Sequence, residues 1–140
     1  MNFNSIRMVT GNVQRMVSFY EQITGQSAIW STPDFAEMRF HTVTLAIAHE
    51  NTIALFGAGA ARPADNHSLI IEFLVEDVDA DYARLSAALQ DLVLPPTTQP
   101  WGNRSLLFRD PDGNLINLFT PVSEAAQQKF KEALAAMRQH

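Results

Sequence analysis

The first part of the chain follows a strand pattern, then a helix pattern, then three short strand patterns. Polar and apolar positions alternate over residues 4–10, which predicts a strand with two distinct faces. Asn12 can cap a helix. The apolar positions behind it recur at helical spacing: Val13, Met16, Val17, Tyr20 and Ile23. Gly25 is typical of a helix end. Three further strands are expected at residues 29–31, 37–41 and 43–48.

The second half of the chain repeats this order at an offset of 65 residues, since Val13 matches Val78 and Asn12 matches Asp77. An apolar strand is expected at residues 69–75, and Asp77 or Asp79 caps the next helix. The stripe of that helix is Val78, Tyr82, Leu85, Leu89 and Leu92. Further strands are expected at 94–97, 105–109 and 115–120. Each half therefore reads strand–helix–strand–strand–strand, and two such halves must pack together to bury their apolar surface.

Turn-forming residues mark the boundaries. Between the last two strands lies a tight hairpin at residues 110–114, in which Gly113 and Asn114 are expected at positive φ. Residues 57–67, rich in small residues and breakers, are expected to link module one (3–56) to module two (68–121). Ser123 caps a last helix at 123–138 with Phe130, Leu134 and Met137 on one face. We expect a single domain over residues 1–140.

Composition narrows the function classes. The chain has ten Lys and Arg against fifteen Asp and Glu, a net charge of −5, which argues against a surface for nucleic acids or anionic membranes. It has no Cys, which excludes disulfides, thiolate metal ligands and Cys nucleophiles. The N-terminus lacks a signal-peptide pattern and no apolar run reaches the length of a membrane span, so a cytoplasmic protein is expected.

Two motifs resemble a known family. The segment from Gly11 to Tyr20, followed by Gly25, resembles the opening strand–helix of the vicinal oxygen chelate superfamily, which includes glyoxalase I, bleomycin-resistance proteins and extradiol dioxygenases. Residues 100–104 and 108–116 resemble its closing hairpin. The resemblance covers residues 3–121 and implies an α+β fold: two βαβββ modules forming a curled mixed sheet cup, usually in a homodimer, here with a C-terminal helix.

The resemblance also implies a metal in the cup, but the matching positions do not carry its usual ligands. They fall on Ser5, Ile70, Asn117 and a position near Ala46 or Ile47. Ser and Asn are neutral weak donors and the apolar side chains donate nothing, whereas divalent metals favour imidazole and carboxylate ligands. We therefore expect no metal and no other cofactor.

Strand alternation places other chemistry in the cup. Arg7 shares a face with Ser5, and Glu72 shares a face with Ile70. Because Arg7 and Glu72 are related by the repeat, the implied pseudo-twofold axis is expected to bring them together at the cup centre. A Glu ionised by an Arg neighbour could hold a polar ligand or take a substrate proton. The alternatives are a purely structural ion pair or the opposite strand phase.

Further candidates have weaker signals. Of the four His at 41, 49, 67 and 140, only His49 has a strand phase that can point into the cup, and one residue of slip would reverse it. Trp101 can offer a flat apolar wall, and Arg104 can meet an anion or stay solvated. The predicted ligand-binding residues are Ser5, Arg7, His49, Glu72, Trp101, Arg104, Asn117 and Phe119, with Glu72 also a candidate catalytic base.

Three functions remain open. The first is a metal-independent, bleomycin-resistance-like protein that binds a small organic molecule in the cup or at the dimer interface. The second is a lyase, isomerase or dioxygenase of the same superfamily, either metal-free with Glu72 as base or metal-dependent through other ligands. The third is an interaction module whose cup is filled by its own side chains.

Overall fold

The computed structural model describes residues 1–139, so His140 lies outside the described residues. The chain divides into two compact units. Unit 1 comprises Met1–His67 together with the hairpin tip Pro111–Gly113, and unit 2 comprises Ser68–Asp110 together with the chain from Asn114 onward. No helix of residues 1–139 is both long and apolar enough to cross a membrane.

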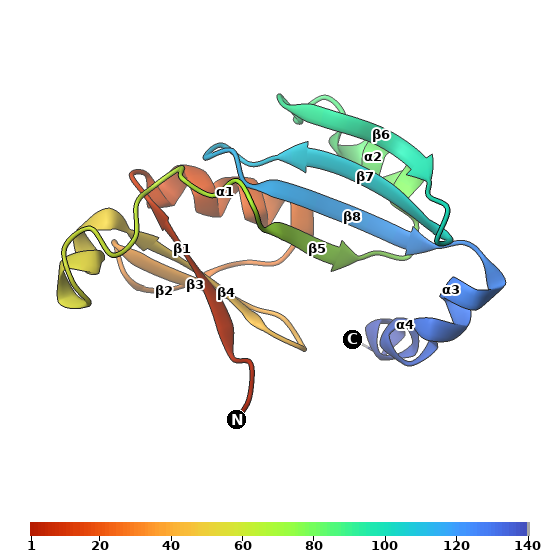
Figure 1. Ribbon diagram of the computed structural model, residues 1–140, viewed down its shortest axis with the longest axis horizontal. Coiled ribbons are helices and arrows are strands. Elements are labelled where there is room, and N and C mark those ends of the chain that lie inside the picture. The colour runs from red at the N-terminus through yellow and green to blue at the C-terminus, as the bar shows by residue number, and fades with distance from the viewer. Residues whose placement is uncertain (140) are drawn as a thin grey trace. The chain divides into compact units, whose positions relative to one another are not determined.

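Unit 1 is a four-stranded mixed sheet with one long helix (Figure 1). Its elements are β1 (Ser5–Thr10), α1 (Val13–Thr24), β2 (Ile29–Thr32), β3 (Phe35–Arg39), β4 (Thr44–His49) and the 3-10 helix η1 (Glu50–Leu55). The strand order is β1-β4-β3-β2, with β1 parallel to β4 and the remaining pairs antiparallel.

Unit 2 repeats this order and ends in two short helices (Figure 1). Its elements are β5 (Ile70–Leu74), α2 (Val78–Leu85), β6 (Leu92–Thr98), β7 (Asn103–Arg109), β8 (Leu115–Pro121), α3 (Glu124–Lys129) and α4 (Lys131–Arg138). The strand order β5-β8-β7-β6 again pairs the first and last strands in parallel. The predicted α+β fold with two βαβββ repeats is therefore confirmed.

The helix that follows the first strand begins in the same way in both units. Asn12 and Asp77 both adopt extended backbone, with φ of −147° and −146°. Each side chain accepts a hydrogen bond from the backbone N–H three positions later in the chain. This satisfies a backbone N–H that a helix start otherwise leaves without a partner. The five apolar positions predicted for α1 are all buried. Gly25 ends α1 with φ of 72°, a conformation that glycine adopts without steric cost.

Several predicted boundaries are wrong. The second helix ends at Leu85, and Leu92 begins β6 instead of completing the helical stripe. The predicted C-terminal helix is two helices separated at Phe130, whose φ of −103° and ψ of 12° interrupt the regular geometry. The strand predicted at residues 37–41 corresponds to β3, which ends at Arg39, so His41 lies outside it. In the hairpin, Gly113 has a positive φ of 85°, but Asn114 does not.

Candidate functional site

The face of the unit 1 sheet that carries Arg7 is fixed by the strand register. Arg7 pairs with Ala46, whereas Met8 pairs with Ile47. Neighbouring positions along a strand point to opposite faces, so Ser5 and Arg7 lie on one face and Met8 on the other. Met8 is buried and its sulfur contacts the hydroxyl of Tyr20 on α1, so the face of Arg7 is the one turned away from α1.

Two aromatic rings lie close to the Arg7 side chain. Its guanidinium carbon is 5.0 Å from the ring centroid of Phe35 and 5.1 Å from that of Phe56. These are cation–π distances. Ser5 on the same face is exposed, and its hydroxyl accepts a long hydrogen bond of 3.4 Å from Asn4. The face therefore presents one positive charge beside aromatic surface.

His49 lies on the opposite face from Arg7. It pairs with Thr10, two positions beyond Met8 on the face that α1 covers. Its Nδ1 accepts a hydrogen bond of 3.1 Å from the backbone N–H of Asn51, which caps η1. The side chain of His49 therefore lies on the face opposite to the one that carries Ser5 and Arg7. A ligand bound on the face of Arg7 would not contact His49.

On unit 2, Glu72 and Asn117 are direct neighbours on one sheet face. They pair across the parallel strands β5 and β8, and Asn117 Nδ2 donates a hydrogen bond of 2.8 Å to Glu72 Oε2. Glu72 is exposed, whereas Asn117 Oδ1 is buried without a hydrogen-bond partner among residues 1–139. A carboxylate and a free amide oxygen thus stand side by side, and both accept hydrogen bonds.

The same register places apolar side chains around this pair. Leu107 pairs with Asn117, and Leu74 pairs with Phe119. Phe119 packs edge-on against Phe130, with ring centroids 5.3 Å apart, so one side of its ring is already covered. Trp101 lies in the turn between β6 and β7, where it is 66% exposed.

Sequence reasoning missed one polar side chain on this face. Asn103 begins β7 and lies four positions before Leu107, so the two share a face. Its Oδ1 is also buried and without a partner in the described part of the chain. The alternation of residues 103, 105 and 107 could have identified it, but only once the phase of β7 relative to Asn117 is known.

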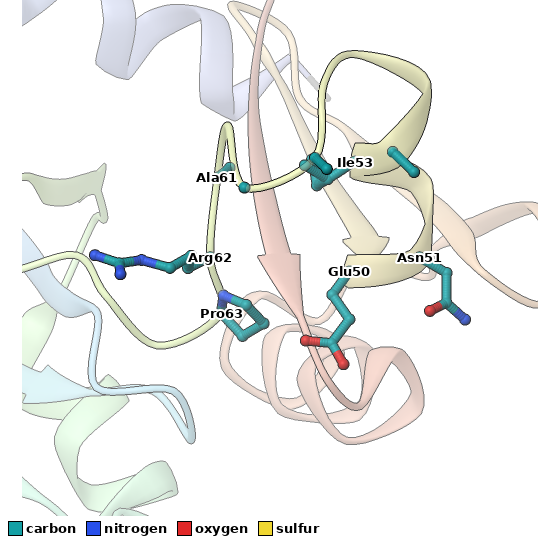
Figure 2. Close-up of a pocket in the computed structure, with 9 residues that line it drawn as sticks. Glu50, Asn51, Ile53, Ala61, Arg62 and Pro63 are labelled. Carbon is teal, nitrogen blue, oxygen red and sulfur yellow. The ribbon is translucent and has the colours of Figure 1, made fainter.

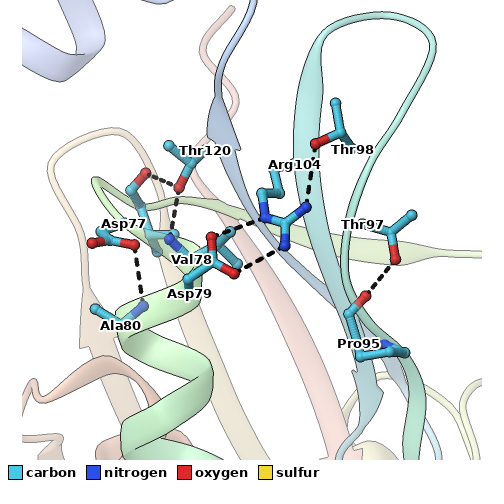
Figure 3. Close-up of polar contacts among 10 residues, drawn as sticks. Asp77, Val78, Asp79, Ala80, Pro95, Thr97, Thr98, Arg104 and Thr120 are labelled. Carbon is cyan, nitrogen blue, oxygen red and sulfur yellow. Dashed lines mark hydrogen bonds and ion pairs between the residues drawn. The ribbon is translucent and has the colours of Figure 1, made fainter.

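Arg104 lies on the other face of the unit 2 sheet and forms an ion pair with α2. Figure 3 shows its guanidinium donating to both carboxylate oxygens of Asp79, at 2.9 and 3.0 Å, and to the hydroxyl of Thr98 at 3.3 Å. The hydrogen bond from Arg104 lowers the pKa of Asp79, and the same bond raises the pKa of Arg104. Ligand binding by Arg104 stays a prediction, and it would require this bidentate pair to open.

The Asp79 pair makes a small, acid-sensitive contribution to stability. Because the pKa of Asp79 is lower in the folded protein than its ordinary value of 3.8, the contribution is present above that value and is lost as the pH falls through the folded pKa. We expect Asp79→Asn to lower the melting temperature by about 3 °C or less at pH 7, since both groups are exposed. The difference from the wild type should shrink as the pH falls below 3.8. A thermal unfolding series from pH 8 downward measures this, and a difference that grows as the pH falls below 3.8 would contradict the assignment.

One open hollow lies beside η1 in unit 1. It has a volume of about 390 Å³ and is lined by Glu50, Asn51, Ile53, Ala54, Ala58, Gly59, Ala61, Arg62 and Pro63. In Figure 2 the side chains of Arg62 and Asn51 extend to opposite sides. The hollow has two charged lining residues, Glu50 and Arg62. Arg62 already forms an ion pair with Asp65 at 2.7 Å. The hollow is open and has no convergent polar groups, so we place the candidate site on the sheet faces instead.

The residues do not fit the divalent metal that the resemblance implies. Of the four matching positions, Ser5 and Asn117 offer neutral oxygens, Ile70 offers no donor, and neither Ala46 nor Ile47 does. Residues 1–139 contain no cluster of three or more His, Cys, Asp or Glu side chains that could hold a metal ion. Glu72 alone supplies one carboxylate, fewer than the three protein ligands that such sites use.

The predicted approach of Arg7 and Glu72 stays a prediction, because Arg7 belongs to unit 1 and Glu72 to unit 2. Within its own unit, each of the two has a partner that the sequence did not suggest. These are the two rings around Arg7 and the amide of Asn117 beside Glu72.

Comparison with solved structures agrees with the βαβββ repeat. A glyoxalase/bleomycin resistance protein/dioxygenase family enzyme from Burkholderia phytofirmans PsJN has a TM-score of 0.77 and 17% identity, covering 87% of this chain and 100% of that one. A glyoxalase/bleomycin resistance protein/dioxygenase from Nocardioides has a TM-score of 0.72 and 23% identity, covering 89% and 85%. A glyoxalase-related enzyme from Fulvimarina pelagi has a TM-score of 0.73 and 20% identity, covering 86% and 88%.

Similarity at these identities establishes the fold, and the family follows from the sequence. A search of curated proteins finds no match. The family model of the glyoxalase/bleomycin resistance protein/dioxygenase superfamily matches residues 2–118, which include both repeats and both motifs that carry the resemblance. The chain therefore belongs to the glyoxalase/bleomycin resistance protein/dioxygenase superfamily.

Proposed function

We propose that this protein binds a small organic molecule on the sheet face of unit 2, through Glu72 and Asn117 and without a divalent metal. The observation that carries the proposal is the acceptor pair itself. Asn117 Nδ2 donates to Glu72, and the buried Oδ1 of the same amide has no donor among residues 1–139. An unpaired buried acceptor costs free energy, about 1–3 kcal/mol, and a ligand N–H at this point would recover part of it.

The pair favours a ligand that donates hydrogen bonds and carries positive charge. Glu72 supplies a carboxylate, Asn117 supplies a carbonyl oxygen, and the chain has a net charge of −5. Leu74 and Leu107 on the same face suit an apolar body behind the charged group. An amine with a small aromatic or aliphatic body is therefore the ligand class we propose.

Three compounds of one size test this ligand class. Chelator-treated protein is titrated with 2-phenylethylamine, 2-phenylethanol and phenylacetate, and binding is followed by calorimetry at low ionic strength. We expect the amine to bind most tightly and Glu72→Gln to weaken it about tenfold, because the variant keeps the shape of the side chain but removes its charge. Glu124→Gln is the matched control, since Glu124 is an exposed carboxylate in the first turn of α3, and it should change the affinity less than twofold.

Two outcomes would contradict the proposal. Equal affinity for the amine and the alcohol, or an unchanged affinity in Glu72→Gln, would remove Glu72 from the site. A protein purified without chelator that retains one metal ion per chain, or that binds the amine only after Zn²⁺, Mn²⁺ or Ni²⁺ is added, would overturn the metal-free part. The thermal shift produced by each ion tests metal binding separately from amine binding, because a bound ion stabilises the folded state.

A further inference from the structure

Arg7 has a positive charge with no anionic partner among the residues that the structure describes, 1–139. It forms cation–π contacts with Phe35 and Phe56, but no hydrogen bond or ion pair among residues 1–139. The nearest carboxylate by register is Glu37, which pairs with the same Ala46 as Arg7 does. That carboxylate interacts with Arg39 instead, at 3.4 Å. The N–H donors of Arg7 are therefore left to solvent or to a ligand.

Two aromatic rings lie within cation–π distance of the guanidinium carbon of Arg7. Where a ring stacks on a guanidinium, it covers a face of the group and leaves the five N–H bonds, which lie in the plane, pointing outward from the edge. A long exposed arginine ordinarily loses rotamer freedom when it binds, and stacking removes part of that cost in advance. Its neighbour across the sheet is small, since Ala46 lies directly opposite Arg7, and the Arg7 side chain is exposed.

An exposed apolar platform adjoins this edge. Phe56, the second ring against Arg7, is 68% exposed, and its neighbour Leu55 is 87% exposed. An apolar surface of this kind favours a ligand with a flat or hydrophobic part. A charged edge beside an apolar platform is the arrangement that binds an organic acid rather than a bare ion.

We propose that Arg7, in cation–π contact with Phe35 and Phe56, anchors an oxyanion-binding site in unit 1 that takes the carboxylate or phosphate of a small aromatic acid. The planar fork of the guanidinium matches two oxygens of either group, and the acid's ring stacks on Phe56. The site has the opposite charge preference to the Glu72 site and lies in the other unit, so it does not depend on the proposed function.

The test uses benzoate, phenyl phosphate, benzyl alcohol and inorganic phosphate as probes. Each is titrated into the full chain at low ionic strength in a buffer without phosphate, and affinity is measured by ligand-observed NMR. We expect benzoate, phenyl phosphate or both to bind at least about tenfold more tightly than benzyl alcohol, since a charge-assisted bidentate pair supplies the difference. Inorganic phosphate shows whether the oxyanion alone is sufficient or the ring is needed as well.

Variants assign the binding to Arg7. Arg7→Gln should weaken binding of the preferred acid at least about tenfold, and Arg7→Lys should weaken it less, because Lys keeps the charge but loses the fork. Arg62→Gln is the matched control: it removes another exposed positive charge of unit 1 and should change the affinity less than twofold. Phe56→Leu should weaken binding while Arg7 stays in place, which covers the case in which Arg7→Gln does not fold.

The outcomes separate this site from the Glu72 site. Glu72→Gln should leave acid binding unchanged, and Arg7→Gln should leave amine binding unchanged. A wild-type protein that binds neither benzoate nor phenyl phosphate more tightly than benzyl alcohol overturns the proposal. Acid binding that persists in Arg7→Gln, or that falls equally in Arg62→Gln, overturns it as well, because the attraction would then come from overall charge.

Discussion

Gly102→Ala is expected to lower the free energy of unfolding by about 3 kcal/mol, the sum of backbone strain and a steric clash. Gly102 has φ of 94°, which side chains with a Cβ rarely adopt. An added Cβ would overlap Ser123 Oγ and lie 2.7 Å from Ser123 Cβ. The same glycine accepts backbone hydrogen bonds from Val122 and Ser123, so the clash falls where the chain enters α3. Urea unfolding measures the loss.

A matched glycine separates strain from clash. Gly113 has φ of 85°, and nothing lies within 4 Å of an added Cβ. Gly113→Ala should therefore cost about 1 kcal/mol, from strain alone. In a Ser123→Gly background, the cost of Gly102→Ala should fall to a similar value, because the overlapping atoms of the Ser123 side chain are absent. Equal losses for Gly102→Ala and Gly113→Ala in the wild-type background would show that the close approach to Ser123 is unimportant.

Asp110→Ala is expected to lower the free energy of unfolding by a similar amount, about 3 kcal/mol. Asp110 is only 4% exposed, and its carboxylate accepts from the backbone N–H of Asn114 at 3.0 Å and from its side-chain amide at 2.8 Å. The backbone N–H of Asp110 in turn donates to the carbonyl of Asn114. Removing the carboxylate takes this acceptor from two donors of Asn114, which is only 8% exposed, and the loss of an acceptor at a buried donor costs more than the bond itself gains.

An exposed aspartate provides the comparison. Asp65 forms a surface ion pair with Arg62, and Asp65→Ala should cost less than about 1 kcal/mol. The loss of unfolding free energy in Asp110→Asn should fall between those of Asp110→Ala and Asp65→Ala, since the amide oxygen still accepts one of the two hydrogen bonds. Thermal or urea unfolding of the three variants gives the order, and an Asp110→Ala loss no larger than that of Asp65→Ala would contradict the structural role of the hairpin.

Local signals predicted the helix starts and the fold. Asn12 and Asp77 are capping residues before an apolar stripe, and this information lies within a few residues of the chain. Helix ends depended on more distant contacts. The helical spacing continues through Leu92, but pairing of Leu92 with Phe108 assigns it to β6. Phe130 fits a helix as well, but its ring packs on Phe119 where the helix is interrupted.

The candidate site shows the same division between local and distant information. Alternation correctly grouped Ser5 with Arg7, because residues two apart on a strand share a face. The partners of each side chain were out of reach. Phe35 and Phe56 reach Arg7 from β3 and from the end of η1, a helix that no sequence pattern indicated. Asp79 reaches Arg104 only because α2 begins beside β7, and no spacing rule connects the two residues.

The parallel pairing of the first and last strands of each unit has a kinetic consequence. In each unit the first strand can pair only after the last strand is in place, because the paired residues are far apart in the sequence: Ser5 lies opposite Thr44, and Ile70 lies opposite Leu115. Closing these long loops costs more chain entropy than forming the antiparallel pairs between neighbouring strands, so we expect the parallel pairs to form late in folding. Arg7 and Glu72 both lie on strands that join last. A chain released before that step would have the antiparallel strand pairs of both units and neither of the two proposed binding faces.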